Sequence, residues 1–227
     1  MISIIIPTYN EADNIGTLIA YIKTVAGSPM FEIIVSDGGS NDHTVSIASN
    51  AGVMVLHCPK KGRAAQMNFA ASMASGSIFY FVHADTLPPK GFFQLIQRAV
   101  ENHFEVGRCQ TKFNSNSLLL KLNAFFTRFD WFMCYGGDQT LFITRTLFEF
   151  IGGFNEQKLI MEDYDITQRA KEKGKYIVFK KSALVSVRKY KKNSWIRVQK
   201  ANYKVVQLYK KGTPSADVAS FYKNYLN

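Results

Sequence analysis

Several short apolar runs of this sequence end in clusters whose residue types could bind a phosphorylated ligand or a metal ion. An acid such as Asp37, between an apolar run and two glycines, could accept the N–H of a nucleobase or ribose hydroxyls. Arg63 could bind a phosphate through two parallel hydrogen bonds. Glycine turns, helix caps and solvated basic turns also explain these patterns. The clusters are 7–11 (PTYNE), 37–42 (DGGSND), 60–68 (KKGRAAQMN), 83–86 (HADT) and 161–165 (MEDYD).

His83 and Asp85 stand two residues apart at the end of the apolar run 78–82. Strand side chains alternate, so both could point the same way and hold Mn²⁺ or Mg²⁺ jointly with a diphosphate. A capped turn before Pro88 is the plain structural alternative. Glu162 and Asp163 either favour a helix N-terminus or include a general base that takes a proton from an acceptor hydroxyl.

The elements that must position these clusters alternate along the first half of the chain. Strands that are apolar throughout and separated by helices predict an α/β fold, with a mostly parallel central sheet and helices on both faces. Ligands of such sheets bind beyond the carboxyl ends of the strands, where the polar clusters fall. We expect strands at 2–6, 31–36, 53–56, 78–82, 105–113 and 139–144 and two short ones in 176–187; helices are expected at 12–25, 42–50, 62–74, 91–102, 118–133, 163–172, 194–211 and 216–226.

In their order along the chain, these clusters resemble the family-2 glycosyltransferases, which have the GT-A fold. The segments GRAAQMN (62–68), HADT (83–86), GDQ (137–139) and MED (161–163) are similar to a compact bacterial subgroup of that family. The resemblance extends from residue 2 to about residue 190. It implies a single GT-A-like domain over 1–227, with a nucleotide-sugar-binding half at 1–112 and an acceptor half at 113–227.

The resemblance also implies a role for each matching residue in binding the donor. Pro7, Tyr9 and Glu11 would line the nucleotide pocket. Asp37 would hydrogen-bond the base, usually uracil in this family, and Arg63 would lie beside the base or the phosphates.

The remaining implied roles concern the reaction. Asp85 would ligate a divalent metal, Mn²⁺ or Mg²⁺, at the donor diphosphate. Asp163 would be the catalytic base of an inverting transfer from a nucleotide sugar, with Glu162 beside it. His83 stands where many relatives carry Asp; it would either ligate the metal, for which Mn²⁺ suits imidazole better, or contact the ribose or sugar.

Positive charge is concentrated in the C-terminal part of the chain. The net charge is +11, and residues 171–211 hold 14 Lys and Arg against one acid. This asymmetry indicates an anionic partner: a phosphate-bearing substrate, an anionic membrane face or nucleic acid. The basic helix expected at 194–211 either lies on a membrane or packs its apolar face on the core. The apolar segment 118–133 could form part of a greasy acceptor groove.

The sequence lacks several motifs that would indicate another compartment or a membrane-spanning protein. Three scattered cysteines give neither a metal motif nor a disulfide framework, and we find no signal peptide and no run of about 18 apolar residues that could span a membrane. We therefore expect a cytoplasmic protein, peripheral on the inner face of the membrane, with a lipid or lipid-linked acceptor. The alternatives are a nucleic-acid-binding protein, a nucleotidyltransferase or a nucleotide-binding relative without turnover.

Overall fold

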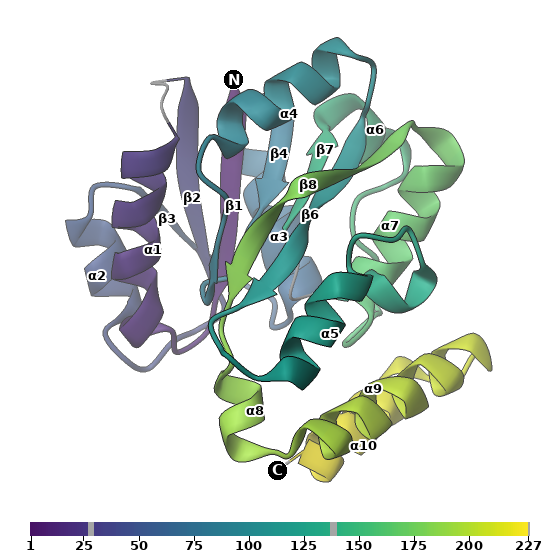
Figure 1. Ribbon diagram of the computed structural model, residues 1–227. Helices are drawn as coiled ribbons and strands as arrows, with labels where there is room; N and C mark the ends of the chain where they lie inside the picture. Colours follow the sequence, from purple (N-terminus) through teal and green to yellow (C-terminus); the bar gives the residue numbers. More distant parts are fainter. Residues whose placement is uncertain (27–29, 137–139, 227) are drawn as a thin grey trace.

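One eight-stranded sheet runs through the part of the chain that the structure, a computed structural model, describes (Figure 1). The described residues are 1–26, 30–136 and 140–226, so the GDQ segment at 137–139 lies outside them. The order of strands across the sheet is β3-β2-β1-β4-β7-β6-β8-β5. The strands are β1 (Ile2–Thr8), β2 (Phe31–Asp37), β3 (Met54–His57), β4 (Ile78–Phe81), β5 (Thr86–Leu87), β6 (Val106–Phe113), β7 (Leu141–Thr144) and β8 (Tyr176–Val185).

Parallel pairing dominates the sheet, as the sequence predicts. Strands β3, β2, β1 and β4 are mutually parallel, and so are β6 and β8. Strand β7 runs antiparallel between β4 and β6, and the short β5 runs antiparallel to β8 at the edge. The carboxyl ends of β1 and β4 therefore lie side by side, which brings the clusters that follow them together.

Helices cover both faces of the sheet, because successive strand residues point to opposite faces. Ile4 of β1 packs in the core beneath α1 (Ala12–Val25), α2 (Thr44–Asn50) and α4 (Phe92–Glu101). Ile5 packs in the core beneath α3 (Arg63–Met73), α6 (Arg145–Phe150) and α7 (Glu162–Lys173) on the other face. The expected α/β architecture with helices on both faces is confirmed.

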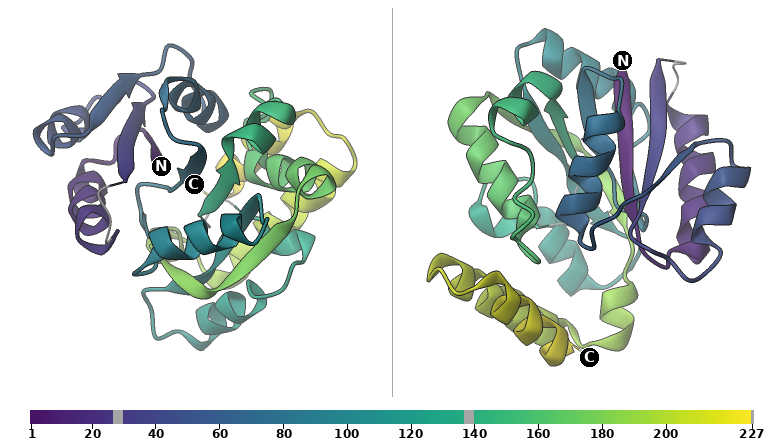
Figure 2. Two further views of the ribbon diagram at one scale, coloured as in Figure 1. Left: turned by 90° about the horizontal axis from the view of Figure 1, so that it is seen from above. Right: turned by 180° about the vertical axis from the view of Figure 1, so that it is seen from behind.

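The C-terminal helices α9 (Trp195–Lys210) and α10 (Ser215–Leu226) run beside one another at one end of the molecule (Figures 1 and 2). Val205 and Val206 of α9 pack with Val218 of α10 and with Met161, which precedes α7. The apolar face of α9 is thus used inside the protein. Of the two explanations for the basic helix, packing against the core is the correct one for this face.

Three expected elements differ in the structure. The two short strands expected in 176–187 form one strand, β8, whose register against β6 shifts between Cys109 and Gln110. The helix expected at 118–133 ends early, giving α5 (Leu118–Phe126) and a separate 3₁₀ turn at Phe132–Cys134. The helices α6 and α8 (Arg188–Lys192) have no counterpart in the sequence-based prediction, because each is too short to show a helical period.

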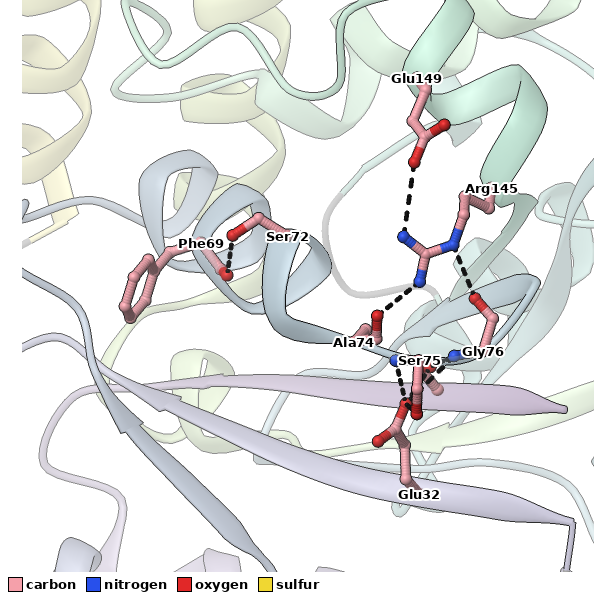
Figure 3. Close-up of polar contacts among 9 residues, drawn as sticks. Glu32, Phe69, Ser72, Ala74, Ser75, Gly76, Arg145 and Glu149 are labelled. Carbon is pink, nitrogen blue, oxygen red and sulfur yellow. Dashed lines mark hydrogen bonds and ion pairs between the residues drawn. The ribbon is translucent and has the colours of Figure 1, made fainter.

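The turn that starts β4 is fixed by charged side chains from two neighbouring elements (Figure 3). The Glu32 carboxylate of β2 accepts hydrogen bonds from the Ser3 hydroxyl and from the backbone N–H groups of Ser75 and Gly76. From the other side, Arg145 donates to the carbonyls of Ala74 and Gly76. Both contacts set the position of β4, whose far end carries His83 and Asp85.

We predict that Glu32→Ala lowers the free energy of unfolding by about 1–3 kcal/mol, because buried donors lose their acceptor. Glu149→Ala is the matched control: its carboxylate is exposed and contacts only Arg145 among the described residues, so we expect an effect of at most about 0.5 kcal/mol. Urea unfolding of both variants measures the difference, and equal stability of the two variants would contradict the role given to Glu32.

The Glu32 effect should also depend on pH. Burial raises the pKa of Glu32, but its hydrogen bonds to Ser3, Ser75 and Gly76 outweigh burial and leave the pKa below its usual value of 4.5. A lowered carboxyl pKa stabilises the folded state above that usual value. The stability gap between the wild type and Glu32→Ala should therefore shrink as the pH falls below about 4.5 through the folded-state pKa.

Candidate active site

A cavity of about 410 Å³ opens at the carboxyl ends of β1 and β4. Its opposite wall comes from the start of α7, from the segment after β8, and from α9 and α10. Eight of the nine site residues predicted from the sequence line this cavity, so the fold gathers clusters that are up to 156 positions apart. These eight are Pro7, Tyr9, Glu11, Arg63, His83, Asp85, Glu162 and Asp163.

Asp37 is the exception, because it is absent from the residues that line the cavity. It is 1% exposed, and its carboxylate accepts hydrogen bonds from the N–H groups of Gly39 and Ser40 and from the Ser40 hydroxyl. In this structure the side chain therefore organises the turn after β2. Gln66, which the sequence analysis did not single out, ties that turn to β1 by donating to the carbonyls of Thr8 and Ser36.

The turn between β1 and α1 is closed by the loop that follows β2. Asn10 adopts a left-handed backbone with φ of 54°. The N–H groups of Asn10, Glu11 and Ala12 donate to the side chains of Ser40, Thr44 and Asp42. These amides at the start of α1 are therefore satisfied by the protein itself.

His83 faces Asp163 across the cavity, with 3.9 Å between His83 Nε2 and Asp163 Oδ2. Burial lowers the pKa of His83 to about 3, and the positive charges of Arg63 and Arg188 act in the same direction. The imidazole is therefore neutral at pH 7 and keeps a nitrogen lone pair that can bind a metal or accept a hydrogen bond. Asp85, from the same strand end, also lines the cavity.

An ion pair between the half-exposed Arg63 and the buried Glu162 joins α3 to α7. The carboxylate of Glu162 is 2% exposed, and its Oε1 lies 2.7 Å from Nη2 of Arg63. Among the residues that the structure describes, neither carboxylate oxygen of Glu162 has a partner with hydrogen-bond geometry, so the Arg63 contact is mainly electrostatic. Met161, just before it, has a left-handed φ of 68°, a conformation that costs a non-glycine residue about 1–2 kcal/mol.

Arg188 is the main site residue that sequence reasoning did not identify. Its Nη1 and Nη2 lie 2.9 and 2.6 Å from the carboxylate oxygens of Glu11, and its Nε lies 3.1 Å from Asp85 Oδ2. One guanidinium thus holds two of the predicted site carboxylates. The only sequence signal was its place in the basic run 188–192, which marks an anionic partner without indicating which lysine or arginine enters the cavity.

Solved structures with the same fold contain bound nucleotide sugars. A mannosyltransferase, PcManGT from Pyrobaculum calidifontis in complex with GDP-Man and Mn²⁺, is 19% identical, with a TM-score of 0.71 over 99% of this chain and 69% of that one. S. aureus TarS 1-349 in complex with UDP-GlcNAc is 20% identical, with a TM-score of 0.68 over 82% of this chain and 58% of that one. At these identities the likeness shows a shared GT-A fold.

Sequence comparison gives the family. A glucosyl-3-phosphoglycerate synthase of Mycolicibacterium smegmatis is 31% identical over 102 residues, which are 40% of this chain and 33% of that protein, so the match spans only a third of the relative's length. The family model "Glycosyl transferase family 2" matches residues 3–155, a segment that includes His83 and Asp85 and ends before Glu162. The chain therefore belongs to glycosyl transferase family 2.

Proposed function

We propose that this protein is an inverting glycosyltransferase that moves a sugar from a nucleotide sugar, a UDP-sugar in our hypothesis, to an acceptor hydroxyl or carboxyl. The observation that carries the proposal is one cavity lined by His83 and Asp85, which follow β4, and by Asp163 at the start of α7, with His83 lying 3.9 Å from Asp163. Residues 1–112 would bind the donor and residues 113–227 the acceptor. Bound UDP-GlcNAc and GDP-Man in proteins of the same fold support the donor class.

Asp85 and His83 are the residues that would hold a divalent metal. A carboxylate and a neutral imidazole fit Mn²⁺, and Mg²⁺ less well because of the nitrogen ligand. Within the described residues no group of three His, Cys, Asp or Glu side chains could hold a metal ion, so diphosphate oxygens and water would complete the coordination. A bound metal would stabilise the negative charge that develops on the leaving diphosphate.

Asp163 is proposed as the general base. Its side chain is 14% exposed and lines the cavity, so it is both shielded and within reach of an acceptor. As the acceptor oxygen bonds to the anomeric carbon, Asp163 takes the acceptor proton, and the electron pair of the breaking sugar–oxygen bond goes to the diphosphate. Attack from the side opposite the leaving group inverts the anomeric centre.

Two arginines would exchange carboxylates for phosphates when the donor binds. In the structure Arg63 contacts Glu162, and Arg188 contacts Glu11 and Asp85. Guanidinium groups bind phosphate oxygens as readily as carboxylates. A diphosphate in the cavity would draw Arg188 away from Asp85 and so release that carboxylate for the metal.

The acceptor in this proposal is a lipid or a lipid-linked molecule, reached at the inner face of the cell membrane. Support comes from the basic side chains of α8 and α9 near the cavity, of which Arg188 and Lys189 line it. Among the described residues no helix is long and apolar enough to cross a membrane.

The donor site is tested by titrating the protein with UDP, with and without Mn²⁺. Asp85→Ala should remove the Mn²⁺ dependence of UDP binding, because the proposed site loses its only carboxylate from the end of β4. Asp13→Ala, which removes an exposed carboxylate of α1, is the matched control and should leave the titration unchanged. Unaltered metal dependence in Asp85→Ala would disprove the ligand assignment.

The base is tested by the release of UDP from a panel of UDP-sugars. Asp163→Asn should bind UDP and Mn²⁺ like the wild type but turn over about 10²- to 10⁴-fold more slowly, the usual effect of losing a general base. A wild-type rate in this variant would show that Asp163 is not the base. Metal-dependent UDP binding without turnover of any donor by the wild type would instead indicate a binding-only relative.

The arginine exchange predicts an unusual effect on metal binding without nucleotide. Arg188→Ala should bind Mn²⁺ alone roughly 3- to 10-fold more tightly, because a competing cation about 3 Å from the carboxylate is gone. The same variant should bind UDP more weakly. Arg197→Ala removes the same charge outside the cavity and should change neither affinity. Equal Mn²⁺ affinity in Arg188→Ala and the wild type would contradict the exchange.

A further inference from the structure

Exposed apolar side chains are concentrated in one short segment of the molecule. Of the 16 large hydrophobic residues exposed in the described part of the chain, seven fall between positions 118 and 133. Each has 38–79% of its surface accessible. We call these seven the aromatic patch: Leu118, Leu119, Leu122, Phe125, Phe126, Trp131 and Met133.

Five of the seven patch residues lie on the outward side of α5, which is apolar on both sides, and Trp131 and Met133 follow that helix. The patch residues at 118, 119, 122, 125 and 126 recur at the spacing that places side chains on one helix face. On the opposite face Leu120 and Ala124 pack against Val185, Tyr190 and Trp195. The inner face of α5 therefore packs the helix against the protein, and its outer face is not part of the core.

The patch is held in a defined shape. Phe126 and Phe129 both stack on Trp131, with ring centroids 5.9 and 4.7 Å away. Buried Arg108 of β6 donates to the carbonyls of Thr127 and Phe129, which fixes the bend after α5. A rigid apolar surface loses little conformational entropy when it is covered, which favours binding.

This surface is separate from the cavity. None of its seven residues lines the cavity, so the greasy acceptor groove expected from the sequence at 118–133 is not part of the cavity that the described residues form. The apolar face of α9 is also unavailable, since Val205 and Val206 are buried against α10. An apolar partner that binds near α5 and α9 would therefore contact the aromatic patch.

The charges around the patch select for an anionic partner. Lys121 and Arg128 lie exposed on the segment itself, and Lys191 and Lys192 are exposed on the adjoining α8. The one acid of the segment, Asp130, is paired with Lys171. A second copy of this chain, with a net charge of +11, would place like charges against like at such an interface.

We propose that the aromatic patch inserts into the interface of an anionic lipid bilayer, with the basic residues of its own segment, Lys121 and Arg128, against the headgroups. An apolar face flanked by lysine and arginine, with Trp and Phe at its centre, is the composition that binds at this depth. Membrane binding by the patch does not depend on the proposed function. Only the use of this surface to present a lipid acceptor rests on the proposed function. Tyr190 lines the cavity and packs on the inner side of α5, so the cavity lies next to the proposed membrane contact.

Co-sedimentation of the full chain with vesicles tests the proposal. Vesicles of phosphatidylglycerol and phosphatidylcholine in equal parts should bind the protein, and vesicles of phosphatidylcholine alone should bind it much less. The double variant Leu122→Ser, Phe126→Ser should partition about 10- to 100-fold more weakly into the mixed vesicles. The control, Phe150→Ser with Leu159→Ser, removes two apolar side chains elsewhere that are more exposed than Leu122 and Phe126 and should bind normally.

Trp131 provides a second readout inside the patch. On mixed vesicles its fluorescence should shift to the blue and be quenched by brominated lipid, and Trp131→Phe should lose this signal while still binding. Equal partitioning of the wild type and the Leu122→Ser, Phe126→Ser variant, or no Trp131 shift, overturns the proposal. A dimer in light scattering that this double variant abolishes, without vesicle binding, would assign the patch to a second copy.

The test is independent of the proposed catalytic function. The double variant changes no cavity residue, so its Mn²⁺-dependent UDP binding should equal that of the wild type. Loss of vesicle binding with normal UDP binding supports the patch. Normal vesicle binding in a protein that fails to bind UDP would contradict the donor site and leave the membrane surface intact.

Discussion

Carboxylates from separate parts of the chain share one cavity, and the structure depends on balancing their charge. Glu11, Asp85, Glu162 and Asp163 all line it. Arg63 pairs with Glu162, and Arg188 pairs with Glu11 and Asp85 together. Removal of Arg63 would leave the buried Glu162 carboxylate without its compensating positive charge. Burial lowers the pKa of His83, and the same two arginines act in the same direction, so their charge contributes to the neutral state of the proposed metal ligand.

The sheet and the C-terminal helices position these charged side chains around the cavity. The N–H of Ser186, just after β8, donates to the carbonyl of Asp85, which brings Arg188 within reach of the β4 end. On the other wall the strained Met161 packs against Val205 and Val206 of α9. Packing there offsets the cost of the left-handed turn that aims Glu162 and Asp163 into the cavity. The helices after residue 190 are therefore a structural part of the site.

Structural features that depend on local residue patterns could be predicted from the sequence. Apolar strands followed by polar clusters predicted the α/β fold, because parallel strands bring their carboxyl ends together. With the family resemblance added, eight of the nine predicted site residues line the cavity. The Arg188–Glu11 pair joins residues 177 positions apart, which no local pattern reveals. The direction of the Asp37 side chain depends on the backbone of its own turn, so a ligand contact and a turn-forming role look alike in sequence. For α5, a helix apolar on both sides has no polar face from which to predict which side is buried.

The separation of the aromatic patch from the cavity would limit what the protein has to recognise in the lipid-linked acceptor that we propose. If the patch lies in the bilayer interface, the hydrocarbon part of the acceptor stays in the membrane and need not enter the protein. The cavity then has to accommodate only the polar end, and its wall nearest α5 carries Arg188, Lys189 and Tyr190 rather than aliphatic side chains. Such a wall suits an acceptor whose reactive group lies beside a phosphate. On this argument specificity comes from charge within the cavity, whereas the patch supplies proximity by confining the protein and its acceptor to the same surface.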